Sequence, residues 1–182
     1  MITLHQPSLG LNAATGHHVF VRMWNTGNVP SAKTPEEIAE WIRIVAQSAP
    51  GGQLRNCVFC CHGSPGYIGL GRGIRRADLH HFGRLVVNGR PLVYKFWFRC
   101  CSVARIPTPA SGTPSGNVFC QEFARTTRAY VVASTETQWE RPRTLPFGQL
   151  DTFEGLVLSY GPTGNVSWSQ RYMSGRLGAL LH

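Results

Sequence analysis

Long hydrophobic runs are absent from this sequence of 182 residues. A membrane-spanning helix needs roughly 20 consecutive apolar residues, so we expect no transmembrane segment and no membrane partner. Residues 1–18 also lack a basic start followed by an apolar block, so we expect no cleavable secretory signal. These absences favour a protein that stays in the cytoplasm or is exported without an N-terminal signal peptide.

Acidic residues are scarce: nine Asp and Glu stand against 18 Lys and Arg, which gives a formal net charge of +9. A charge of this sign attracts anions, whether nucleic acid, anionic lipid or an acidic protein. The basic residues are scattered along the chain, however, and no nucleic-acid-binding motif accompanies them. We therefore expect a solvated basic surface that could hold an acidic partner, and we do not expect nucleic acid to be bound.

The cysteines are few and clustered, which excludes one class of protein. Three of the six lie within five positions and two more are adjacent: Cys57, Cys60, Cys61, Cys100 and Cys101. A small secreted protein spreads its cysteines over loops that disulfides then join, whereas these lie in or beside apolar runs. We predict reduced thiols and a cytosolic folding compartment.

The apolar pattern predicts an α/β fold, because strands and helices alternate through most of the chain. We expect one domain over residues 1–182, with a core at about 17–136 and an antiparallel extension at about 140–182. The expected architecture is a three-layer sandwich, a largely parallel central sheet flanked by helices. Predicted strands cover 18–24, 56–61, 92–98, 130–134, 156–160 and 166–171, the last two forming a hairpin; predicted helices cover 35–49, 77–86 and 117–128.

Chemistry-bearing residues follow two of the predicted parallel strands. His62 comes directly after the strand at 56–61, and Cys101 follows the strand at 92–98. The carboxyl ends of parallel strands meet at one edge of a sheet, where ligands bind. A cysteine nucleophile needs at least a thiol beside an imidazole, because the imidazole can take the thiol proton and leave a thiolate. Two other predicted strand ends carry Asn25 and Glu136, either of which could orient the imidazole.

These segments resemble those of a known family. Residues 61–66 read Cys-His-Gly-Ser-Pro-Gly, and residues 101–104 read Cys-Ser-Val-Ala. With the glycine-rich hairpin, helices and strands around them, they resemble the caspase-like cysteine peptidases of clan CD. The likeness is strongest to bacterial caspase-like domains and to separase-related peptidases with a Cys-Ser-Ser-Ala motif. The caspase signature Gln-Ala-Cys is absent, since Arg99 and Cys100 precede Cys101, so we do not expect caspase-type specificity for aspartate.

The resemblance implies a cysteine peptidase without a cofactor, acting on a protein or peptide substrate. Cys101 would be the nucleophile and His62 the general base and acid. The backbone N–H groups of Gly63 and Cys101 would form the oxyanion hole. The size and charge of the chain would suit a bacterial toxin or effector. Residues expected to contact the substrate are Tyr67, Thr135, Glu136 and Trp139.

Three alternatives remain open at this point. Cys100 is the rival nucleophile, but side chains alternate along a strand, so only one of the two cysteines can face His62. A catalytically inactive caspase-like module could instead use its basic face to bind an acidic partner or nucleic acid. Zinc binding is the third: the thiols and His62 supply suitable ligands, although Cys57-x-x-Cys60 lies inside a predicted strand rather than in a turn.

Overall fold

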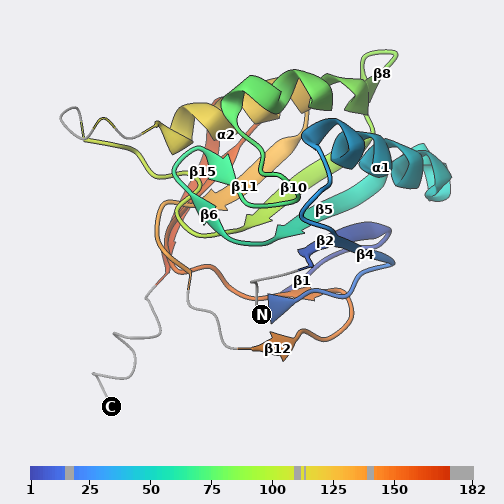
Figure 1. The fold of residues 1–182 in the computed structure, drawn as a ribbon, viewed down its shortest axis with the longest axis horizontal. Coiled ribbons are helices and arrows are strands. Elements are labelled where there is room, and N and C mark those ends of the chain that lie inside the picture. Colours follow the sequence, from blue (N-terminus) through green and yellow to red (C-terminus); the bar gives the residue numbers. More distant parts are fainter. Residues whose placement is uncertain (15–18, 109–111, 113, 139–141, 173–182) are drawn as a thin grey trace.

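The protein is built on one seven-stranded, mostly parallel sheet (Figure 1). The computed structural model describes residues 1–182 except 15–18, 109–111, 113, 139–141 and 173–182. Five neighbouring strands run parallel, and the last two continue the sheet antiparallel. From one edge to the other, the strands are β15 (Val166–Tyr172), β14 (Gly155–Tyr160), β11 (Tyr130–Ser134), β10 (Val93–Arg99), β5 (Leu54–Cys60), β2 (Ser8–Ala13) and β4 (Asn25–Val29).

Three longer helices connect the parallel strands: α1 (Pro35–Ser48), the 3₁₀ helix η2 (Arg76–Leu85) and α2 (Gly116–Thr127). The start of α1 is specified locally, because the Thr34 hydroxyl accepts from the Glu37 N–H while the Glu37 carboxylate accepts from the Thr34 N–H. All three helices were expected near these positions. Within the described residues, none of the helices has the length and apolar character that a membrane crossing requires.

The helices all lie on one face of the sheet, which corrects the expected three-layer sandwich. The buried residues of α1, η2 and α2 belong to a single apolar cluster together with Phe59 of β5 and Phe96 of β10. The strand order explains this arrangement. From β4 through β5 and β10 to β11 the chain always advances in the same direction across the sheet, so right-handed crossovers put every helix on the same side.

The opposite face is covered by irregular segments that carry short strand pairs. Here β1 (Ile2–Thr3) pairs with β13 (Gln149–Leu150), and β3 (Val19–Phe20) pairs with β12 (Arg143–Thr144). A second apolar cluster lies beneath them and includes Val58, Trp97 and Val132 from the sheet. The connection from β2 to β4 runs the other way across the sheet, so it crosses this face.

The predicted strand over residues 18–24 is wrong as an element of the central sheet. Val21 lies on the face of the sheet instead, tied to Asn12 of β2 by two hydrogen bonds of 2.8 and 3.1 Å. The sheet strands of this region are β2 and β4. The predictions for β5, β10, β11 and the C-terminal hairpin are confirmed, and that hairpin extends the sheet. The mixed α/β class is therefore correct, with one helical layer rather than two.

Candidate functional site

His62 and Cys101 leave the sheet at the same edge and at the same level. The strands β5 and β10 are hydrogen-bonded neighbours, and their last paired residues are Cys60 and Arg99. His62 and Cys101 each come two positions after this pair. The parallel register therefore carries the imidazole-bearing and the thiol-bearing segments to one rim, side by side.

Gly63 makes a direct contact between these two segments. A Cβ at this position would lie 2.8 Å from the Cβ of Cys100 and 2.9 Å from the carbonyl oxygen of Cys101. Such distances are too short for any side chain, so only glycine fits between the two strand ends. The backbone after His62 thus packs against the backbone of Cys101 itself.

The His62 side chain is exposed at the beginning of a short hairpin. The strands β6 (Gly63–Ser64) and β7 (Tyr67–Ile68) form this hairpin, as expected from its glycines. The N–H of Gly69 donates to the His62 carbonyl oxygen at 2.8 Å, which fixes the backbone of the histidine. The imidazole is therefore accessible to a ligand while its main chain is held.

The two adjacent cysteines have opposite environments. Cys100 is fully buried, its thiol donating to the carbonyl oxygen of Phe59 at 3.4 Å and its sulfur lying 3.3 Å from the sulfur of Cys61. Cys101 is half-buried, and its sulfur accepts from the backbone N–H of Gln138 at 3.4 Å. Strand alternation separates the pair as expected. Cys101 is the accessible thiol of the two.

A strained turn follows Cys101. Ser102 has a φ of +55°, a left-handed conformation that costs a non-glycine residue roughly 1 kcal/mol. Two hydrogen bonds to the end of β11 hold the turn: Ser102 N–H donates to Glu136 O at 2.9 Å, and Ala104 N–H donates to Ser134 O at 3.0 Å. The first residue of α2, Gly116, packs directly against this turn, because a Cβ at Gly116 would overlap the carbonyl oxygen of Val103. The nucleophile candidate thus lies on a constrained backbone.

A buried charge cluster lies two residues before Cys101 and was missed by the sequence reasoning. Arg99 is only 2% exposed, and its Nη2 lies 3.8 Å from Oδ2 of Asp151. The same carboxylate oxygen accepts from Arg143 at 2.6 Å. The only signal in the sequence is an arginine within the apolar run of β10. Alternation places Arg99 on the same face of the sheet as the Cys101 side chain.

Only some of the residues that were predicted to contact the substrate lie near His62 and Cys101. Tyr67 is half-buried on the hairpin, with the Arg75 guanidinium 4.7 Å from its ring centre. Thr135 is buried and its hydroxyl donates to the carbonyl oxygen of Leu156 at 3.2 Å. This side chain therefore binds the neighbouring strand β14 rather than facing the site. Glu136 touches the Cys101 turn through its backbone, while its side chain packs over Gly155. Trp139 lies outside the described residues.

The two residues that were predicted as candidates for orienting the His62 imidazole, Asn25 and Glu136, lie in different parts of the sheet. Asn25 is the first residue of β4 and pairs with Leu9, whose other partner is Cys57. Asn25 is therefore level with the middle of β5, five positions before His62, and does not reach this edge. Glu136 is at the right edge, but on the far side of β10 from the histidine.

The thiols of Cys57, Cys61 and Cys120 are buried and do not form a group of metal ligands with any other residue that the structure describes. Burial raises the pKa of Cys57, Cys61 and Cys120 well above the ordinary thiol value, and the hydrogen bond to Cys100 raises that of Cys61 further. Among the residues with described positions, no group of three or more His, Cys, Asp and Glu side chains could hold a metal ion. The zinc alternative thus gains no support from this part of the chain.

Comparison with known family models, with curated proteins and with solved structures found no match for this chain. What is established is a mixed α/β protein with a seven-stranded, mostly parallel sheet.

Proposed function

We propose that this protein is a caspase-like cysteine peptidase in which Cys101 is the nucleophile and His62 the general base. The observation that carries the proposal is the register of β5 and β10, which brings both residues to one rim two positions beyond the last strand pair. The exposed imidazole and the half-buried thiol are each reachable from solvent. The family resemblance of the His-Gly and Cys-Ser-Val-Ala segments supports the same roles.

The proposed reaction is peptide-bond hydrolysis through an acyl-enzyme. His62 takes the thiol proton, and the Cys101 thiolate attacks the carbonyl carbon of the substrate. The N–H groups of Gly63 and Cys101 would stabilise the oxyanion that forms. The tetrahedral intermediate then collapses as the imidazolium protonates the leaving amine. Water, deprotonated by His62, releases the acid product and regenerates the thiol.

Two local features suit this chemistry. The Gln138 N–H is aimed at the Cys101 sulfur, where it can donate to a thiolate. The turn at Ser102 is pinned to β11, so the nucleophile is held rather than mobile. A protein or peptide is the proposed substrate, and a bacterial toxin or effector is the biological setting that the size and charge of the chain would suit.

The test is covalent labelling by peptidyl chloromethyl ketones that differ in the residue next to the electrophile, read by intact mass and peptide mapping at pH 7. We expect one modification per chain, on Cys101, and none in Cys101→Ala. His62→Ala should react on the order of 100-fold more slowly, as for loss of a general base. Cys100→Ala is the matched control and should label like the parent protein.

Labelling on Cys100, or equal labelling of the parent and Cys101→Ala, would refute the assignment of the nucleophile. If a folded parent protein reacts with none of the ketones, the peptidase proposal fails. The inactive binding module would then be the better description.

A further inference from the structure

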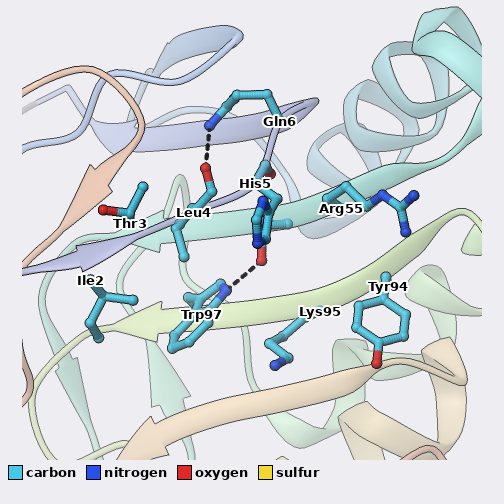
Figure 2. Close-up of a pocket in the computed structure, with 10 residues that line it drawn as sticks. Ile2, Thr3, Leu4, His5, Gln6, Arg55, Tyr94, Lys95 and Trp97 are labelled. Carbon is cyan, nitrogen blue, oxygen red and sulfur yellow. Dashed lines mark hydrogen bonds between the residues drawn. The ribbon is translucent and has the colours of Figure 1, made fainter.

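A pocket of about 660 Å³ lies at the opposite end of the same strands (Figure 2). Its walls come from residues 2–6, from the start of β5 and from the start of β10. Lys95 in this pocket precedes Cys101 by six positions on β10. Since a strand rises about 3.3 Å per residue, the two are roughly 20 Å apart, so the pocket is separate from the proposed peptidase site.

The pocket is basic. His5, Arg55 and Lys95 line it, and no carboxylate is among its lining residues. Other basic side chains of this protein are paired with acids, as Arg84 is with Glu36. Within the described part of the chain, by contrast, neither Arg55 nor Lys95 takes part in an ion pair. The pocket therefore presents positive charge that the protein itself does not neutralise.

Lys95 is the most constrained of these cations. Its ammonium group is half-buried and lies 5.3 Å from the ring centre of Trp97, 5.8 Å from that of Tyr130 and 5.9 Å from that of Tyr94. Burial lowers the pKa of Lys95, because the charged form is partly desolvated. The aromatic faces offset only part of this cost. A bound anion would supply the missing counter-charge.

The wall of the pocket is preformed. The indole N–H of Trp97 donates to Oδ1 of Asn56 at 2.8 Å, and Nδ2 of Asn56 donates to the carbonyl oxygen of His5 at 2.9 Å. These bonds fix the indole against the 2–6 segment, as the dashed line to Trp97 in Figure 2 indicates. Tyr94 remains 46% exposed, so its ring face is open to a ligand at the mouth.

We propose that this pocket binds a small phosphate ester that carries a planar ring, of which a nucleoside monophosphate is the simplest example. The phosphate group pairs with the ammonium group of Lys95, and the exposed Arg55 adds positive charge at the rim of the pocket. The planar ring packs on the exposed ring of Tyr94. The volume lies within the range of about 300–1,000 Å³ that small-molecule pockets occupy.

Isothermal titration calorimetry at low ionic strength tests the proposal with AMP, adenosine and inorganic phosphate as ligands. AMP should bind the full chain about tenfold more tightly than adenosine or phosphate, because only AMP carries both the phosphate that pairs with Lys95 and the ring that packs on Tyr94. Lys95→Gln should weaken AMP binding by about tenfold, the loss of one charge-assisted contact. Arg55→Gln should weaken it by only about twofold, because its charge acts on the phosphate from a greater distance. Arg55 is exposed, so its replacement does not threaten the fold.

Arg90→Gln is the matched control, since Arg90 is an exposed arginine outside the pocket. It should leave AMP affinity unchanged, as should Cys101→Ala. The proposal is overturned if millimolar AMP produces no binding, or if Arg90→Gln weakens binding as much as Lys95→Gln does. It is also overturned if phosphate binds as tightly as AMP, because the ring would then contribute nothing. None of these outcomes depends on peptidase activity.

Discussion

The two faces of the central sheet differ in what they bury. The apolar cluster on the helix-covered face includes six phenylalanines and four cysteines. The face covered by irregular segments has a smaller apolar cluster and buries polar groups beside it, among them Asn56, Arg99 and Asp151. The side chains of Lys95, Arg99 and Cys101 alternate onto this second face. We infer that one face mainly supplies stability, while the other carries the side chains on which the proposed binding and catalysis depend.

The sharpest test of this difference is Phe123→Ala on the helix-covered face. The Phe123 ring is fully buried, with its centre 5.0 Å from those of Phe82, Phe96 and Phe98. We expect a loss of about 4 kcal/mol in the free energy of unfolding, measured in urea, because a cavity opens where the aromatic rings meet. Phe147→Ala, at a 56% exposed position, should change stability by less than about 0.5 kcal/mol. Equal effects would contradict the central role of this cluster.

On the other face, Asp151→Asn should cost somewhat less, about 3 kcal/mol, because it removes the carboxylate that faces the buried Arg99. The control is Glu122→Gln, which breaks the more exposed ion pair with Arg76 and should cost less than about 1 kcal/mol. Urea unfolding of both variants gives the comparison. If the two losses match, the buried cluster contributes no more to stability than the more exposed ion pair does.

The contrast between the faces also shows what the sequence could predict. Local signals were sufficient for α1, where Thr34 and Glu37 specify the helix start, and for the apolar strands β5, β10 and β11. The sequence of β2, Ser-Leu-Gly-Leu-Asn-Ala, lacks such a signal, and its burial comes from neighbours far along the chain. The placement of all helices on one face follows from strand order, which no local pattern encodes.

Local sequence patterns also predicted only part of the candidate site around His62 and Cys101. The strand ends at His62 and Cys101 could be recognised from apolar runs followed by polar residues. The contact of Gln138 with Cys101 and the pairing of Arg99 with Asp151 could not, because they join residues far apart in the sequence. Thr135 was expected to contact substrate, but its hydroxyl bonds to a carbonyl of β14.

The buried thiols of the helix-covered face predict a pH dependence. Burial raises the pKa of Cys57, Cys61 and Cys120 in the folded state. Below about pH 8.5 both folded and unfolded chains keep these protons, so their contribution is constant. Above that pH the unfolded chain loses protons that the folded chain retains, and stability falls by roughly 1 kcal/mol per pH unit for each thiol.

Urea unfolding between pH 8 and pH 10 measures this slope. Cys57→Ala provides the control, because it removes one thiol and should flatten the slope by about 1 kcal/mol per pH unit. Identical slopes in the two proteins would mean that the Cys57 thiol is not desolvated in the folded state.

The smallest effect is expected at the strained turn. Ser102→Gly should raise stability by about 0.5–1 kcal/mol, because glycine adopts a positive φ without strain. Arg128→Gly, at a φ of +51° after α2, is the matched substitution and should give a gain of similar size. Only Ser102→Gly should also slow labelling of Cys101, since it loosens the backbone beside this proposed nucleophile. If labelling is equally fast in both variants, the strain has no part in positioning Cys101.

The strand β10 is paired along both of its sides, with β5 and with β11. Sliding it along its axis would break both ladders at once, so events at Lys95 cannot be transmitted to Cys101 by a shift of the strand. By this route, the proposed occupancy of the basic pocket and the proposed acylation of Cys101 should therefore not affect each other. Selection could remodel either end of this strand while leaving the other untouched.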